Sequence, residues 1–206
     1  MATKMTQRKI LAVLAGGLVL GVGAAVTLAS WNDSEFAAGT FTAGAFNLEG
    51  STTSASAGYD DHNVDDADTA ASLAFQLPAA AAALSPDDVV YAPFWVRLDS
   101  TTTNNATLTP AGITAGTGGN EANLSYTVRA IAPEATCDAT AAGTLVASGD
   151  TLSALTGATA VPLTKGATAG TAGDAVQLCF AVTAGDVTQG DSATATWEFT
   201  ATSTAD

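Results

Sequence analysis

The sequence predicts an all-β protein, an antiparallel β-sandwich that we expect to be a jelly roll. In the second half of the chain, apolar and polar residues alternate strictly over residues 124–130, 176–183 and 193–202. Such alternation indicates strands with one buried and one solvent-facing side, as in antiparallel sheets. The composition agrees, because Thr, Ala, Gly and Asp dominate and long runs without Thr, Gly and Pro, which helices need, are rare.

The first half of the chain carries fewer regular elements. Residues 50–71 are polar and rich in acids, which predicts a loop, and residues 72–77 predict a short strand. The alanines of residues 79–83 allow one or two helical turns, which end at the Ser-Pro-Asp-Asp turn signature of residues 85–88. Two further strands are predicted, over residues 89–98 and near residues 106–109.

The chain begins with the features of an export signal. Lys4, Arg8 and Lys9 make a positive start, and residues 10–29 are uncharged and end in small residues where a signal peptidase cuts. A retained transmembrane anchor is the alternative, because roughly 20 apolar residues can span a bilayer. Four glycines weaken this run as a helix, and no basic stop-transfer cluster follows it. We therefore expect residues 1–29 to be a cleaved signal peptide.

Removal of that peptide leaves a strongly acidic, exported protein. We divide it into an extended segment, residues 30–50, and a β-sandwich domain, residues 51–206. Three basic residues then face 20 acidic ones, a formal net charge of about −17. Nucleic acids and anionic lipids are bound through clustered Lys and Arg. We therefore expect no nucleic-acid partner, and membrane contact only through an uncleaved signal segment.

Cys137 and Cys179 are the only cysteines in the sequence. An exported chain meets an oxidising environment, so we expect them to form one structural disulfide. The bond closes a loop of about 43 residues and contributes roughly 4 kcal/mol by the chain-entropy model. Two thiols and the single histidine, His62, do not make a four-ligand zinc site.

The densest acidic cluster offers a candidate calcium site. Asp61, Asn63 and Asp65 stand at positions 1, 3 and 5 of a calcium-loop pattern. The pattern then fails, because Asp66 replaces the glycine of position 6 and Ser72 replaces the glutamate of position 12. An EF-hand is therefore not expected. A looser calcium site and a solvated acidic loop remain as alternatives.

The sequence offers little for catalysis. A zinc protease of the His-Glu-x-x-His type needs two histidines, and a serine triad would have to use His62 within the acidic loop. Paired carboxylates are expected by chance among 20 acids. We expect no enzyme, no catalytic residues and no cofactor other than calcium.

Three groups of motifs carry a resemblance to a known family. The first combines the small-residue junction after the signal, Trp31-Asn32-Asp33, and Phe41-Thr42-Ala43-Gly44-Ala45-Phe46-Asn47-Leu48. The second is Leu84-Ser85-Pro86-Asp87-Asp88 before a strand, and the third consists of Cys179-Phe180-Ala181-Val182 and Thr196-Trp197-Glu198-Phe199. In these motifs the chain resembles the TasA/camelysin family of secreted proteins with SipW-type signal peptides, in a branch like that of the actinobacteria. It departs from the family at Asp87, where the family's turn has glycine.

The resemblance implies a jelly-roll subunit of extracellular matrix fibres, as in biofilms. In such fibres the N-terminal segment of one subunit completes the sheet of the next, by donor-strand complementation. It assigns this role to a segment that contains Trp31, Phe36 and Phe41. The expected partners are further copies of the chain and, during export, signal peptidase. A monomeric cell-surface binding module, stabilised by calcium, is the alternative.

Overall fold

The structure, a computed structural model, describes residues 4–15, 35, 38, 43–76, 83–156 and 159–204. The chain divides into two compact units, Met1–Thr42 and Ala43–Asp206. In the first unit, residues 4–15 form an α-helix that includes the three basic residues of the expected signal peptide. Among the described residues, no helix is long and apolar enough to cross a membrane. The expected cleavage site lies outside the described residues, as do Trp31, Phe36 and Phe41.

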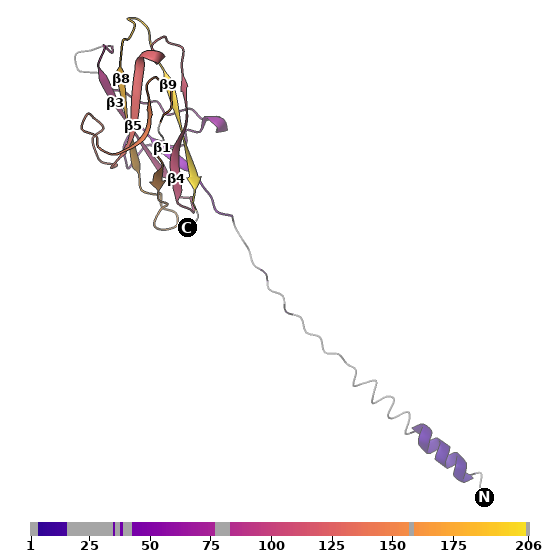
Figure 1. Cartoon of the computed structure of the whole chain (residues 1–206). Coiled ribbons are helices and arrows are strands. Elements are labelled where there is room, and N and C mark those ends of the chain that lie inside the picture. Colours follow the sequence, from indigo (N-terminus) through magenta and orange to yellow (C-terminus); the bar gives the residue numbers. More distant parts are fainter. Residues whose placement is uncertain are drawn as a thin grey trace. The chain divides into compact units, whose positions relative to one another are not determined.

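The second unit consists of two antiparallel sheets packed against each other (Figure 1), which confirms the predicted all-β sandwich. In the described part of the chain, the larger sheet has the order β2-β1-β3-β8-β5-β6 and the smaller sheet the order β7-β4-β9. The strands are β1 (Leu48–Ser51), β2 (Tyr59–Asp60), β3 (Val89–Leu98), β4 (Ala106–Ala115), β5 (Leu124–Ile131), β6 (Thr144–Gly149), β7 (Val161–Leu163), β8 (Val176–Ala184) and β9 (Ala195–Ser203). Two 3₁₀ turns complete the list, η1 (Val64–Asp66) and η2 (Glu121–Asn123). The jelly-roll connectivity stays a prediction.

Aromatic rings from both sheets form the centre of the core. Phe180 of β8 is 1% exposed, and its ring lies 5.1 Å from that of Trp197 on β9. Tyr126 of β5 contacts the same indole at 5.5 Å, also edge to face. Such pairs add stability beyond the apolar area that they bury. The alternation seen in the sequence therefore places these residues on the faces that join the two sheets.

The strongest strand predictions are confirmed. Residues 89–98 form β3 with the predicted bounds, and the three alternating stretches become β5, β8 and β9. The strand predicted near residues 106–109 is longer, because β4 continues past a bulge between Pro110 and Gly112 to Ala115. Residues 43–50, assigned from the sequence to the extended N-terminal segment, lie in the second unit, where β1 pairs with β3.

Several elements differ from the expectation or were not anticipated. β6 and β7 had no clear pattern, because β6 is buried at two neighbouring positions and β7 is only three residues long around Pro162. β2 lies within the predicted acidic loop. The strand predicted over residues 72–77 is not formed over residues 72–75, and only Gln76 pairs, through a single bridge to Tyr91. The helical turns predicted at 79–83 lie almost entirely outside the described residues.

The turn before β3 places Asp87 in a conformation that favours glycine. Asp88 N donates to Ser85 O at 3.1 Å, which closes a turn with Pro86 at its second position. Asp87 has a φ of 68°, in the left-handed region. A type II turn needs a positive φ at this third position, which glycine adopts without strain and Asp tolerates better than most residues. The sequence prediction of a turn at residues 85–88 is confirmed.

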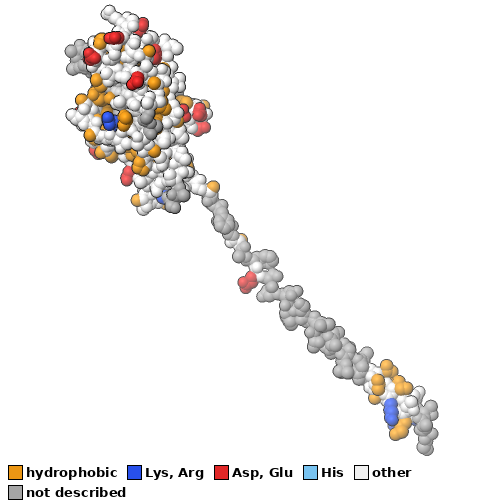
Figure 2. Space-filling view, in the orientation of Figure 1, with side chains coloured by type: hydrophobic (Ala, Val, Ile, Leu, Met, Phe, Trp, Pro, Cys, Tyr) orange, Lys and Arg blue, Asp and Glu red, His pale blue; other side chains and the backbone are white. Residues whose placement is uncertain are grey.

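Acidic side chains are spread over the surface of the second unit, with few basic ones among them (Figure 2). Arg97 of β3 is paired with Glu49 of β1, Nε to Oε1 at 2.5 Å, and its guanidinium lies 3.7 Å over the ring of Tyr59. One of the few cations is therefore already matched inside the larger sheet. The surface presents the acidic character that the sequence predicted.

Candidate functional site

The predicted calcium ligands lie around η1, where their polar atoms bond to one another. The Oδ1 atom of Asn63 accepts from Asp65 N at 3.1 Å and caps η1. Asp61 Oδ1 accepts from Asn63 N at 3.2 Å, and Asn63 Nδ2 donates to Asp66 Oδ2 at 2.7 Å. The described residues contain no group of three or more His, Cys, Asp or Glu side chains that could hold a metal ion. These hydrogen bonds use one side-chain oxygen each of Asp61 and Asn63, and calcium binding at Asp61, Asn63 and Asp65 stays a prediction.

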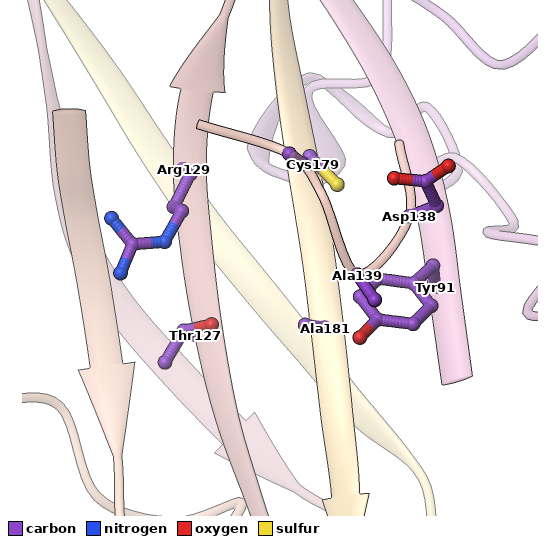
Figure 3. Close-up of a pocket in the computed structure, with 8 residues that line it drawn as sticks. Tyr91, Thr127, Arg129, Asp138, Ala139, Cys179 and Ala181 are labelled. Atoms are coloured by element: carbon purple, nitrogen blue, oxygen red, sulfur yellow. The ribbon is translucent and has the colours of Figure 1, made fainter. Parts of the chain in front are cut away.

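A hollow of about 140 Å³ lies on the outer face of the larger sheet (Figure 3). Arg129 and Tyr91 line it from β5 and β3, and Asp138 lines it from the loop after β5. The charged groups of Arg129 and Asp138 both form hydrogen bonds with residues of this loop. Arg129 Nη1 donates to Gly143 O at 3.1 Å, and Asp138 Oδ1 accepts from Thr140 Oγ1 and N. The bonds from Thr140, first from its hydroxyl and then from its backbone, hold the pKa of Asp138 below its usual range.

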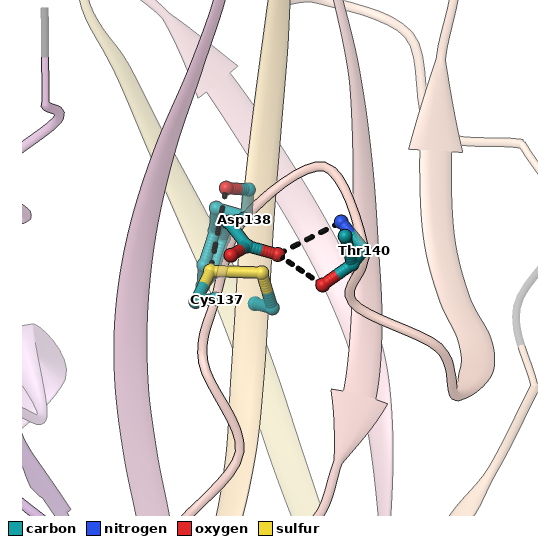
Figure 4. The surroundings of a disulfide bond; sticks show 5 residues. Cys137, Asp138 and Thr140 are labelled. Atoms are coloured by element: carbon teal, nitrogen blue, oxygen red, sulfur yellow. Dashed lines mark hydrogen bonds between the residues drawn. A yellow bond between two sulfur atoms is a disulfide. The ribbon is translucent and has the colours of Figure 1, made fainter.

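The same loop is held to the sheet by the predicted disulfide, which is confirmed (Figure 4). Cys137 is bonded to Cys179 of β8, with 5.3 Å between their Cα atoms. Trp95 Nε1 donates to Pro133 O at 2.7 Å and fixes the other end of the loop. His62, the single histidine of the chain, bonds through Nδ1 to Thr69 O rather than to a hydroxyl or carboxylate. On the face of the hollow, Arg129, Trp95 and the disulfide therefore all hold the loop after β5 to the sheet.

The strand edges of the two sheets differ in length and cover. At the edges of the larger sheet, β2 has two residues, and β6 is partly covered because Ser148 and Thr156 exchange backbone hydrogen bonds. In the smaller sheet, β7 has three residues, whereas β9 has nine. β9 pairs only with β4 among the described residues. It is the long edge strand of the sandwich.

The register shows which backbone groups of β9 face its unpaired side. Gly116 N donates to Thr194 O, and Thr204 N donates to Asn105 O, both at 2.8 Å. In an antiparallel ladder the bonded residues alternate, so the even-numbered residues of β9 bond to β4. The odd-numbered residues direct their N–H and C=O groups to the other side. They are Ala195, Trp197, Phe199, Ala201 and Ser203.

Ala195, Trp197, Phe199 and Ala201 also point their side chains towards the core, yet all four are only partly buried. Trp197 Nε1 is buried and has no acceptor at hydrogen-bond distance among the described residues. Burial raises the pKa of Tyr126, and the indole of Trp197, whose ring lies 5.5 Å from that of Tyr126, opposes this rise. The core is therefore incompletely covered along the unpaired side of β9.

An extended segment borders this unpaired side. In the smaller sheet, β4 lies near β6, at one edge of the larger sheet, and Trp197 of β9 packs on Phe180 of β8, nearer its middle. The free edge of β9 therefore faces the side of the larger sheet where β3 lies. Residues 71–76 lie on that side, since Gln76 bridges β3 and the ring of Phe75 lies 6.4 Å from that of Trp197. Their burial alternates residue by residue as in a strand. They have no ladder partner beyond the Gln76 bridge among the described residues.

The candidate site is therefore the free edge of β9 together with residues 71–76, which we call the β9 edge. It presents five residues with outward backbone donors and acceptors beside half-covered aromatic side chains. An open strand edge of this kind can accept an additional strand, which satisfies the backbone groups and covers the apolar side chains. Its chemistry is that of binding an extended peptide.

Comparison with known proteins adds no assignment: no protein-family model and no curated protein matches the chain. The sequence identified the alternation of β9 but not its position at an edge, because strand order depends on pairings between distant residues. For residues 71–76, the other part of the β9 edge, the one signal in the sequence was the strand predicted over residues 72–77. The proposed assembly residues Trp31, Phe36 and Phe41 lie outside the described residues, so their role at this edge stays a prediction.

Proposed function

We propose that the protein is a secreted structural subunit, without enzymatic activity, that polymerises head to tail into extracellular or cell-surface fibres. One observation carries the proposal: among the described residues, the nine-residue β9 has an unpaired edge beside half-covered Trp197 and Phe199. A segment of a second copy, from residues 30–42, supplies the additional strand. Repetition of such a head-to-tail contact that does not close produces a filament.

Three further features support this role. The disulfide is compatible with an oxidising, extracellular compartment. Residues 1–29 have the composition of a signal peptide, and cleavage frees residues 30–42 to bind elsewhere. The motifs shared with the TasA/camelysin family are found in secreted fibre proteins. Intact-mass measurement of the secreted protein tests the export step, and a mass that includes residues 1–28 contradicts it.

The decisive experiment is negative-stain electron microscopy of the secreted protein and of two variants. Deletion of residues 30–38 is expected to leave a folded, secreted domain that forms no filaments. Ala201→Pro is expected to do the same, because it removes an N–H that faces away from β4 and leaves the β4 ladder intact. Circular dichroism checks the fold of both variants.

Thr202→Pro is the matched control for the edge. Thr202 pairs with Thr107 and bonds to β4, so proline there should lower the melting temperature of the domain. Filaments that persist in the Ala201→Pro variant or after the deletion would refute pairing at the β9 edge. A wild-type protein that stays monomeric in microscopy and size-exclusion chromatography would favour the cell-surface binding module instead.

A further inference from the structure

A larger cavity, of about 450 Å³, lies where β9 begins. Leu84 and Pro86 line it from the turn before β3, Leu124 lines it from the start of β5, and Val187 and Ala193 line it from the loop between β8 and β9. Ala193 is two residues before Ala195, so the cavity continues directly from the β9 edge. Its wall combines these apolar residues with polar ones from the same loop, Thr188, Gln189, Asp191 and Ser192.

Asn120 holds this loop in place from beneath. It is 5% exposed, and its Nδ2 atom donates to Thr188 O at 3.0 Å and to Asp191 O at 3.1 Å. Its Oδ1 atom accepts from Thr188 N at 2.8 Å and from Asn123 Nδ2 at 3.2 Å. Every polar atom of this side chain is therefore used, and the cavity is formed in advance of any occupant.

The second unit has two ends, and their positions determine which residues of a neighbouring copy can reach the cavity. Its chain begins at Ala43, and Ala45 O accepts from Thr103 N at 3.0 Å. The adjacent Asn104 and Asn105 bond to Thr204, just after β9 ends. The chain thus enters the domain at the end where β9 finishes, whereas the cavity lies at the end where β9 starts.

In a head-to-tail row of copies, the entry end of one copy therefore lies next to the cavity end of the following copy. The residues closest to Ala43 meet the cavity first, and the preceding residues continue along β9 antiparallel to it. Phe41 is the aromatic residue nearest to Ala43 on that side. Residues 36–48 carry no charge, so this part of the segment brings no like charge to an acidic domain.

We propose that the cavity is the anchoring site for the Phe41 side chain of a neighbouring copy, which sets the direction and register of the donated strand. The inference rests on the proposed function and deepens it. With Phe41 beside Ala195, Gly39 lies opposite Trp197 and Ala37 opposite Phe199. The small residues of the donor then contact the large aromatic residues of β9, and the Phe41 side chain fills the cavity at the start of β9.

The test is a pairwise disulfide trap between copies of the mature chain. Mixing a Phe41→Cys chain with a Val187→Cys chain under mild oxidation is expected to give a mixed dimer on a non-reducing gel. Val64→Cys replaces Val187→Cys in the control, because Val64 is 56% exposed on η1 and does not line the cavity. No dimer, or equal dimer with the control, overturns the proposal. A bond formed within a diluted Phe41→Cys/Val187→Cys chain also overturns it, since the occupant is then the chain's own segment.

Assembly measurements give an independent reading. Phe41→Ala is expected to raise the protein concentration needed for filaments by about tenfold or more, as for truncation of a buried aromatic anchor. Phe36→Ala, an equal truncation in the same segment, should have a smaller effect. Filaments without the Phe41–Val187 crosslink would refute the anchor and leave the fibre proposal standing. A wild-type chain without filaments would refute the fibre proposal, and the crosslink would still report on the anchor.

Discussion

Removal of the disulfide is expected to destabilise the domain by an amount that the chain connectivity sets. Cys137 and Cys179 are 42 residues apart, and the chain-entropy model for a loop of this length gives about 4 kcal/mol at 25 °C. For a domain of roughly 160 residues, each kcal/mol shifts the melting temperature by about 2–4 °C, so we expect a fall of about 8–16 °C. Cys179 is 3% exposed, and alanine is therefore a better replacement than serine.

The assay is urea unfolding of the oxidised wild type, the reduced wild type and the Cys137→Ala/Cys179→Ala variant, with the free energy of unfolding extrapolated to water. The last two should agree within experimental error. Amide exchange should increase in the loop over residues 132–143, which the bond holds to β8, and less in β5. A difference below about 1 kcal/mol between the oxidised protein and the variant would refute the loop-closure reasoning.

Three further outcomes are expected. Asp87 has a positive φ, so Asp87→Gly should raise the free energy of unfolding by up to about 1 kcal/mol and Asp87→Val should lower it by about 1–2 kcal/mol. Equal effects of the two substitutions in a urea titration would contradict this. Hydrogen bonds from the backbone N–H groups of Gly118, Glu121 itself and Gly119 lower the pKa of Glu121 below its ordinary 4.5. The stabilising contribution of the Glu121 carboxylate is therefore present above pH 4.5 and disappears as the pH falls through the folded-state pKa. The stability difference between the wild type and Glu121→Gln should accordingly shrink below about pH 4.5, and a difference that stays constant down to pH 2 would contradict this assignment. Millimolar calcium should raise the melting temperature through Asp61, Asn63 and Asp65, and an unchanged melting curve would identify the loop as a solvated surface.

Local residue patterns determined the position of most long strands, the disulfide and one turn of this protein. Alternation of apolar and polar residues located β3, β5, β8 and β9, because one buried and one exposed face is a property of a strand that its own sequence carries. The two cysteines likewise determined their pairing, since they are the only two in the chain. Pro86 followed by two aspartates predicted the turn before β3 for the same local reason.

Only the tertiary structure decided which strand lies at an edge. β9 alternates as regularly as β5, yet among the described residues β5 is paired on both sides and β9 on one. Pairing depends on residues far apart in the chain. Residues 72–75 carry a strand pattern, yet among the described residues they form no ladder and only the following Gln76 pairs, with Tyr91. The cavity at the start of β9 is equally non-local, since Leu84, Leu124 and Val187 meet there from three separate parts of the chain. A sequence specifies the faces of its strands locally, whereas open edges and cavities arise where distant segments meet or fail to meet.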